Sequence, residues 1–490
     1  EMQLRGQADL VVNKIHPAVE ISKALMTYNH PRFQIFPRED SDVEVATVLN
    51  NLIEYIWNIS DGNIQLKQAI DDYLIKGKGY LILYFDPLED NGKGEIKIKY
   101  IDALEVFPDM HCTDKYERDA AFYFISKVVS RERAKMMYPE HKRAIDNAKG
   151  CVDELPYEGL SGDTSLDKEN MAITKADTQS RTQDLVRILE KYEPISVKFY
   201  RIVDYVRGGE YLLNENEFVE FLNTPVYILE LPNGEIFYSD KLQEVNDALF
   251  AILQNVKDEE TIKEYIKNNP IKTGKIEDLI DGGYIEYVDI VKRRIKRTIL
   301  VGDKIIGEEI MPISDYPIIP FPNIWNGTPF PLSDVKVAMG LQDFINKLMS
   351  LIIAHTQAST NIKLLLPKGS IQNREMIERE WAKPLAIIEY DPQFGKPEFA
   401  SPTPLSNEVF ALLAQVTNEI NYQFGVFELS HGDTRAAPNT VRGTMLLDEF
   451  GQRRIKSKLD DIENGLNILG RVLILSLIHI SEPTRPLYIS

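Results

Sequence analysis

The chain has 490 residues, more than one compact core usually accommodates, so two or more domains are expected. Hydrophobic residues make up 43% and charged residues 27%, values that are typical of a folded globular protein and exclude wholesale disorder. The formal net charge of −19 disfavours a monomeric sequence-specific DNA-binding protein, because phosphate contacts require a basic surface. An acidic surface is compatible with DNA that slides past without sticking.

Metal, disulfide and membrane signals are missing from the sequence. Cys112 and Cys151 fit neither a metal-ligand spacing nor a disulfide framework, so we interpret them as free thiols in a reducing cytoplasm. The seven histidines form no HxxxH or HxH pair. No signal peptide is recognised, and no apolar run reaches the roughly 20 residues of a membrane span. The sequence therefore predicts no cofactor, no metal and no membrane contact.

The first half of the chain is predicted to mix helices and strands. Apolar spacing predicts helices over residues 9–28, 41–58 and 63–76, the last ending at Gly77. Alternation then predicts a hairpin of 80–87 and 94–102, followed by strand 121–130 and helix 131–138. Further strands are predicted at 185–194, 197–206 and 282–306, the last with a turn at Val301-Gly302-Asp303.

Two segments of this half are predicted to be insertions. Residues about 142–184 are poor in large apolar groups and are expected to form a mobile loop. Residues 207–280 mix strands with two polar helices, near 239–256 and 258–268. The basic run KRRIKR at 292–297 is interpreted as the exposed face of an alternating strand, with a DNA-binding patch as the alternative.

The second half of the chain is dominated by long helices. An extended proline-rich linker, 311–332, leads to Ser333, which is expected to cap a helix over 334–360. A small α/β stretch is predicted at 361–402, a second long helix at about 406–424, a loop at 425–440 and a third long helix at about 441–474. The first of these helices carries an apolar stripe of Val337, Leu341, Phe344, Ile345, Leu348, Leu351 and Ile352.

The last residues differ from the rest. Leu475 to Arg485, LSLIHISEPTR, resembles the translation of a transposon-derived sequencing adapter, a read-through familiar in assembled metagenomic contigs. We therefore expect Leu475–Ser490 to be an artefact and the natural protein to continue beyond about Ile474. The alternative is a genuine amphipathic C-terminal tail.

Enzymatic signatures are missing from the chain. It contains no Walker A motif, GxGxxG, GxSxG, HExxH or EF-hand loop. Gly77-Lys78-Gly79 follows a predicted helix, whereas a phosphate-binding loop follows a strand, so we interpret it as a helix-to-strand turn. Asp71, Asp72 and Asp86 could be imagined as a two-metal nuclease site, but nothing in their spacing requires one, and we interpret them as solvated or capping residues. The sequence predicts that the chain is not an enzyme.

The order of parts carries more information than any motif. Two long helices flank a short excursion, and such helices most simply form an antiparallel pair. One hairpin cannot cover both wide apolar stripes, which favours packing between neighbouring subunits. An ordinary helical domain is the alternative.

Several segments, in order, resemble portal proteins of the P22-like kind over roughly residues 10–474. They are DYLIKGKGYLILYFDP, GEIKIKYIDALEVFPD, Asp119-Ala120, RRIKRTILVGDKII, YPIIPFPNIWNGTPFPLSDV, LQDFINKLMSLI, LLLPKGSI, NYQFGVFELSHGD and LLDEFGQRR. Their order is specific, although no single piece is diagnostic. One departure is Pro438 to Gly443, PNTVRG, where the family carries a small Ser-Gly pair.

The resemblance implies an α+β portal fold in named parts. These are a wing over 1–332 that includes both insertions, stem helices at 333–360 and 403–424, a clip at 361–402, a tunnel-loop region at 425–440, and a helix at 441–474 directed to a largely missing crown. The implied function is a dodecameric ring at a capsid vertex of a tailed bacteriophage, assembled in the host cytoplasm. The implied partners are double-stranded DNA bound without sequence specificity, the terminase large subunit, head-completion and tail adaptor proteins, and major capsid and scaffold proteins.

Candidate residues follow from the implied positions. DNA-facing basic rings are expected at Lys347, Lys363, Lys368 and Arg435, in a channel wall that is otherwise acidic or neutral. The stem-packing residues are expected to be Leu341, Phe344, Ile345, Leu348, Leu351 and Ile352. The alternatives are another structural virion protein, such as a tail or connector component, and a metal-dependent nuclease.

Overall fold

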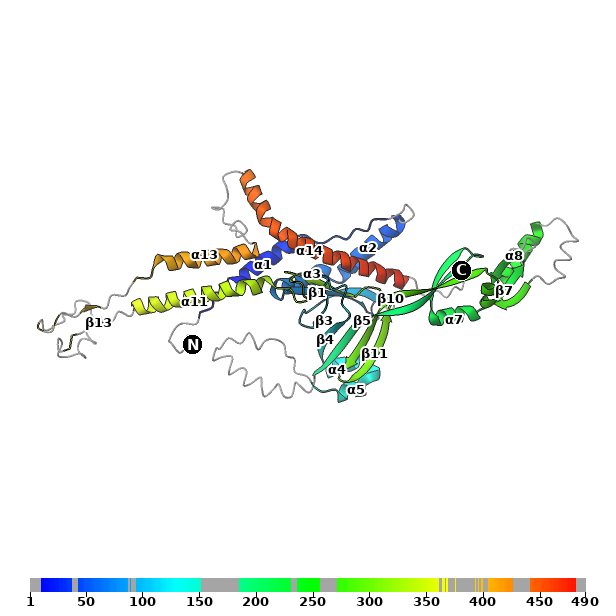
Figure 1. Cartoon of the computed structure of the whole chain (residues 1–490), viewed down its shortest axis with the longest axis horizontal. Coiled ribbons are helices and arrows are strands. Elements are labelled where there is room, and N and C mark those ends of the chain that lie inside the picture. Colours follow the sequence, from blue (N-terminus) through cyan, green and yellow to red (C-terminus); the bar gives the residue numbers. More distant parts are fainter. Residues whose placement is uncertain are drawn as a thin grey trace.

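A computed structural model describes residues 10–37, 43–86, 89, 94–150, 185–230, 236–255, 271–360, 404–425 and 441–481, with residues 364, 365, 367, 368, 375, 393, 395, 398 and 399. This part of the chain is a mixed α+β structure with several antiparallel sheets and long helices, as predicted. The molecule is elongated: the helices α11 (Asp334–Thr360) and α13 (Asn407–Phe424) extend from one end of a central body, and a small module extends from the other (Figure 1).

Three N-terminal helices and a three-stranded sheet form one part of the body. The helices are α1 (Ile15–Met26), α2 (Val43–Ile59) and α3 (Gly62–Ile75). The sheet has the order β12–β1–β2, from β12 (Ile318–Pro322), β1 (Lys78–Asp86) and β2 (Glu95–Ile101). The predicted hairpin is confirmed, with Leu83 opposite Ile98. Gly77 ends α3 with a φ of +91°, a conformation that suits glycine.

The strand β12 corrects the predicted linker. Residues Ile318–Pro322 pair antiparallel with β1, and all five are buried. Prolines normally argue against a strand because they cannot donate to the ladder. Here Pro320 and Pro322 lie on an edge strand, where the side of the strand that faces away from β1 has no neighbouring strand and requires no backbone N–H donor.

A larger sheet lies beside this layer, with the order β11–β10–β5–β4–β3. The strands in this order are β3 (Val106–Pro108), β4 (Tyr123–Ser130), β5 (Leu185–Asp204), β10 (Ile285–Val301) and β11 (Lys304–Met311), and a further strand, β6 (Gly209–Asn214), pairs with the last residues of β5. The predicted turn at Gly302 joins the last two strands. The short helices α4 (Arg131–Met137) and α5 (Lys142–Asn147) share a small apolar core with the sheet, and the single turn η4 (Pro139–His141) connects them. The segment predicted to be an insertion thus begins with a helix, while its residues 151–184 lie outside the described chain.

The strand β5 is one continuous element of 20 residues, whereas two strands were predicted, 185–194 ending at Pro194 and 197–206. Pro194 lies opposite Ile295 of β10, and pairing with β4 ends two residues earlier at Tyr192. Pro194 therefore lies beyond the end of β4, where β5 has no neighbouring strand on the β4 side. Its missing N–H does not remove a hydrogen bond from the sheet.

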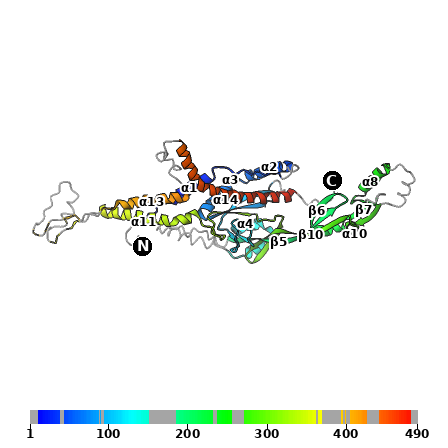
Figure 2. The ribbon, with the colours of Figure 1, turned by 45° about the horizontal axis from the view of Figure 1, so that its top comes forward.

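A separate module, here called the satellite module (residues 205–284), lies at the far end of the β5–β10 ribbon (Figure 2). Its described elements are β6 (Gly209–Asn214), α7 (Glu215–Asn223), β7 (Pro225–Glu230), β8 (Ile236–Ser239), α8 (Leu242–Asn255), β9 (Ile271–Lys275) and α10 (Ile276–Asp281). The helix predicted near 239–256 is confirmed, and the one near 258–268 lies outside the described residues. Its own core stacks Phe218 on Tyr200, with ring centroids 4.0 Å apart.

The long helix α14 (Val441–Ser481) crosses the body and closes the main core. Its buried residues Ile462, Leu469 and Val472 join the same apolar cluster as the N-terminal helices and β12. The helix runs seven residues past the predicted end, and Leu477 is buried in that cluster. The adapter origin of the last residues stays a prediction.

Candidate functional site

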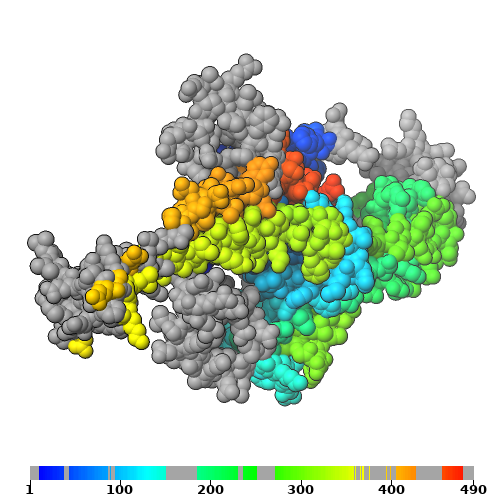
Figure 3. All heavy atoms as spheres, turned by 60° about the vertical axis from the view of Figure 1, so that its left-hand side comes forward, coloured from blue at the N-terminus to red at the C-terminus, as the bar shows by residue number. Residues whose placement is uncertain are grey.

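The helices α11 and α13 lie side by side as an antiparallel pair that projects from the body (Figure 3). Both helices begin at caps: the Ser333 hydroxyl accepts from the Lys336 amide at 2.9 Å, and the Ser406 hydroxyl accepts from the Glu408 amide at 3.2 Å. The predicted helix 334–360 and its cap are therefore confirmed. Gly425 ends α13 in the left-handed region.

The predicted apolar stripe of α11 is only partly covered by this chain. Ile345 is fully buried, and Leu341, Leu348 and Ile352 are half-buried. Phe344 and Leu351 remain 40% and 52% exposed. On α13, Val416, Ile420 and Phe424 are buried, while Phe410 and Leu412 are exposed. The pair thus buries one face and presents a second apolar face to its surroundings.

Two of the four predicted DNA-facing residues can be placed. Lys347 is exposed on α11, and Lys368 is exposed in a turn beyond that helix. Lys363 and Arg435 lie outside the described residues. Within the predicted excursion, β13 (Leu364–Leu365) pairs with β14 (Glu398–Phe399) near the free end of the helical pair.

A buried charge pair holds the turn that precedes α11. The Lys78 ammonium binds the Glu117 carboxylate and the Pro329 carbonyl oxygen. The Glu117 carboxylate also accepts from the Tyr123 hydroxyl at 2.8 Å. Burial lowers the pKa of Lys78, while the Glu117 charge opposes that shift. Gly77-Lys78-Gly79 is therefore a helix-to-strand turn with a structural lysine, as we interpreted it.

The start of α11 is also tied to β12 and α14. Asp334 is 5% exposed, and its Oδ2 atom accepts from the Asn323 amide at 2.9 Å. The same oxygen binds the ammonium of Lys458 on α14. The sequence did not predict this contact, because no local pattern links residues 124 positions apart.

The N-terminal segment lies along α11 and is held there by two side-chain amides. The Gln342 amide donates to the Val12 carbonyl at 2.7 Å and accepts from the Lys14 amide at 2.9 Å. The Asn346 amide oxygen accepts from the Val12 amide at 3.2 Å. The helix was predicted to begin at residue 9, but α1 begins at Ile15. The bonds to Gln342 and Asn346 hold residues 12–14 along α11 and explain the later start.

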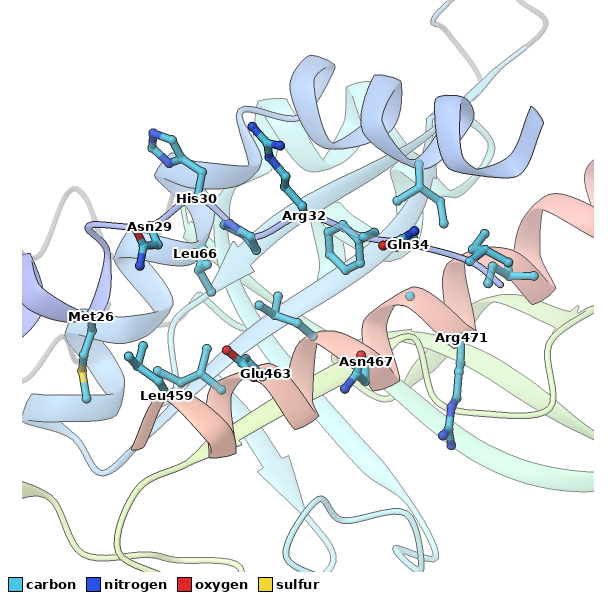
Figure 4. A pocket seen from close by; sticks show the side chains of 18 of the residues that line it. Met26, Asn29, His30, Arg32, Gln34, Leu66, Leu459, Glu463, Asn467 and Arg471 are labelled. Carbon is cyan, nitrogen blue, oxygen red and sulfur yellow. The ribbon is translucent and has the colours of Figure 1, made fainter. Parts of the chain in front are cut away.

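An open pocket of about 810 Å³ separates α14 from the segment that follows α1 (Figure 4). Leu459, Glu463 and Asn467 line it from α14, and His30 and Arg32 lie across it. The lining is mixed, with apolar side chains beside charged ones.

The basic run of β10 is tied into the sheet, which corrects its predicted exposure. Arg294 is buried and donates to the Pro312 carbonyl. Arg297 contacts Glu190 at 3.1 Å, and Lys296 contacts Glu308 at 3.1 Å. Arg297 and Lys296 form ion pairs with acidic residues that lie diagonally across on β5 and β11, so part of the basic run is not an open alternating face, while Arg293 is exposed as predicted.

The carboxylates weighed for a nuclease are engaged elsewhere. Asp71 pairs with Lys23 at 2.9 Å. Asp72 pairs with Lys76 at 2.8 Å and accepts from the Tyr100 hydroxyl at 2.7 Å. Within the described residues, no group of three or more histidine, cysteine, aspartate or glutamate side chains could hold a metal ion. Cys112 is a free, buried thiol, and burial raises its pKa to about 12.

Residues 1–440 match the family described as phage P22-like portal protein. The chain belongs to this family. No curated protein matches the chain. Portal proteins are structural and not enzymes, so the predicted absence of an activity is confirmed by the family. The family implies an oligomeric ring at a capsid vertex of the virion and a role in DNA packaging.

One helix, α11, is apolar enough over most of its length to be compared with a membrane-spanning helix. By length and composition, the stretch Asp334–Gln357 could cross a membrane. Its mean hydropathy over an 18-residue window is 1.3, and 17% of that window is buried. The sequence has no uninterrupted apolar run over these residues, because polar side chains are spaced along a stretch that is apolar on average. One such helix is weak evidence for a membrane.

Proposed function

We propose that the chain is a subunit of a dodecameric ring at the capsid vertex, through which double-stranded DNA is packaged and later ejected. The observation that carries the proposal is the projecting α11–α13 pair, whose outer apolar side chains this chain leaves exposed. Exposed apolar surface of this kind is typical of an interface. In a closed ring, each subunit covers a different face of its neighbour, so every copy of the stripe is buried.

The partners are proposed from the positions of the parts. The excursion at 361–402, at the free end of the helical pair, would dock the terminase large subunit and later the head-completion and tail adaptor proteins. The body would meet the major capsid and scaffold proteins during assembly in the bacterial cytoplasm. DNA would pass without sequence specificity, because a conduit must contact phosphate without holding it.

The channel wall is proposed to be acidic or neutral with a few basic rings. Lys347 and Lys368 are exposed, which their proposed contact with DNA requires, and Lys363 and Arg435 complete the set. The net charge of −19 supports weak overall attraction to DNA. A ring reconstruction showing a uniformly basic lumen would contradict this part of the proposal.

Negative-stain microscopy of the full-length gene product tests the ring directly, and twelvefold particles are expected. Leu351→Glu should abolish them or weaken assembly at least tenfold, since it places a charge on the proposed apolar interface. Gln357→Glu is the matched control, because it adds the same charge at an exposed polar position of the same helix. Light scattering should then report the ring mass for the control and a monomer for Leu351→Glu. Unimpaired rings of Leu351→Glu would contradict the proposal.

A further inference from the structure

A group of polar side chains fastens the middle of α14 to the body, inside an otherwise apolar contact. We call this group the α14 clamp; it consists of Lys458, Asp461, Asp334, Lys115 and Tyr73. The Lys458 ammonium binds the Asp334 carboxylate, and the Lys115 ammonium lies 2.5 Å from the Asp461 carboxylate. In the first ion pair α14 supplies the cation, and in the second it supplies the anion. Together the two pairs fix the position of α14 along its axis.

The clamp joins two helices that the chain separates widely. Asp334 is the first residue of α11, and Lys458 lies near the middle of α14. Asn323 donates to the same Asp334 oxygen at 2.9 Å, which holds the carboxylate in place from the side of β12. Any movement of α14 that withdraws Lys458 therefore removes the charged partner from the first turn of α11.

Tyr73, the buried member of the clamp, has a hydroxyl with no hydrogen-bond partner among the described residues. The side chain is 1% exposed, and the Lys458 ammonium lies 5.8 Å from the centre of its ring. Burial and the nearby charges of Asp334 and Asp461 raise the pKa of Tyr73. A buried hydroxyl without a partner is costly, and here it is a proton donor close to two carboxylates.

The opposite flank of α14 has room to move. The pocket of about 810 Å³ lies between α14 and the segment after α1, and Leu459 and Glu463 face it, next to the clamp residues in sequence (Figure 4). A close-packed interior would resist a shift of the helix, whereas an open pocket accepts it.

We propose that the clamp has two states. In the closed state, which the structure presents, Lys458 binds Asp334 and the Tyr73 hydroxyl is unpaired. In the open state, α14 tilts into the pocket, Lys458 withdraws into solvent, and the Tyr73 hydroxyl donates to the Asp334 carboxylate. Tyr73 thereby replaces the lysine as the second donor to the buried carboxylate, beside the Asn323 amide, which stays in place. The proposal concerns one subunit and does not depend on ring formation.

Amide hydrogen exchange of the full chain tests the two states, with Lys458→Met, Tyr73→Phe and the double variant. Lys458→Met should speed exchange in the first turns of α11 and across the middle of α14. The same substitution in the Tyr73→Phe background should speed it at least tenfold more, because the Asn323 amide is then the one donor that the Asp334 carboxylate keeps among the clamp contacts. Tyr73→Phe alone should slow exchange, because it removes the unpaired hydroxyl from the closed state and the donor from the open state.

Lys456→Met is the control, since Lys456 is exposed on the same helix, and it should leave exchange unchanged. Additive effects of the two clamp substitutions would overturn the proposal. Faster exchange of Tyr73→Phe alone would also overturn it, because that result means the hydroxyl is already bonded in the closed state. The conservative Tyr73→Phe variant keeps the test decisive even where Lys458→Met does not fold.

Discussion

At the scale of single residues, Glu190 shows how the large sheet tolerates a buried charge. The side chain is 2% exposed, and its carboxylate meets Lys127 at 3.1 Å and Arg297 at 3.1 Å. The Tyr192 hydroxyl donates to it at 2.8 Å. Burial opposes the ionised form, but the two cations and the hydroxyl together hold the pKa of Glu190 below its usual value.

Replacing Glu190 by Gln should therefore lower the free energy of unfolding by about 2–3 kcal/mol at neutral pH, because Lys127 and Arg297 lose the carboxylate that neutralises them. The folded pKa lies below the unfolded value of about 4.3, so the carboxylate stabilises fully above that pH. The contribution is lost as the pH falls through the folded pKa. Denaturant titrations at several pH values should show the gap between variant and parent closing below about pH 4.

The matched control is Glu308→Gln, which removes an exposed partner of Lys296. Its cost should be below about 1 kcal/mol at every pH, as for other surface pairs. Equal costs for the two variants would contradict the role assigned to Glu190.

At the scale of elements, the contact between α14 and β12 depends on a glycine. A Cβ atom at Gly465 would lie 2.7 Å from the ring of Phe321, which is 1% exposed and cannot move aside. The helix therefore approaches the edge strand more closely than any other residue type would allow. Gly340 of α11 offers a comparison, because a Cβ atom there meets nothing within 4 Å.

The two glycines should respond oppositely to the same change. Gly465→Ala should lower the free energy of unfolding by about 1–3 kcal/mol, because it overpacks the contact. Gly340→Ala should raise it by up to about 1 kcal/mol, since alanine favours a helix. Chemical denaturation of both variants measures the difference in the free energy of unfolding. A stabilising Gly465→Ala would mean that α14 does not pack against Phe321 at this position.

At the scale of the whole molecule, the chain has separate cores joined by a two-stranded ribbon. The main core unites the N-terminal helices, the small sheet, α11, α13 and α14. The satellite module has its own core around Phe218, at the other end of β5 and β10. This separation implies that the module can lose structure without unfolding the body.

Phe218→Ala tests that separation. Removing the buried ring should destabilise the satellite module by about 3–5 kcal/mol, because the stacking on Tyr200 and a well-packed volume are lost. Hydrogen exchange should accelerate in α7, β7 and α10 and stay unchanged in β1 and β2. Val219→Ala, at an adjacent residue that is 52% exposed, should change little. Acceleration throughout the body would show instead that the two cores unfold as one.

Several features followed from the sequence because short-range physics decides them. The cap at Ser333 and the period of the apolar residues after it predicted α11, and Gly302 predicted the turn between β10 and β11. The order of the segments also led to the portal family before any contact was known. The cap, the apolar period and the turn glycine each lie within a few residues of the feature that they predict, whereas the family was indicated by the order of segments along the chain.

The tertiary structure decided what depends on distant partners. Ile318–Pro322 becomes a strand because β1 offers a free edge 240 residues earlier, and Pro194 stays within β5 because β4 has already ended. Lys458 meets Asp334, and Tyr73 is left unpaired beneath them, only because α14 crosses the body. Such pairings carry no local signature, since the hydrogen bonds and charges that enforce them appear only once the chain has folded.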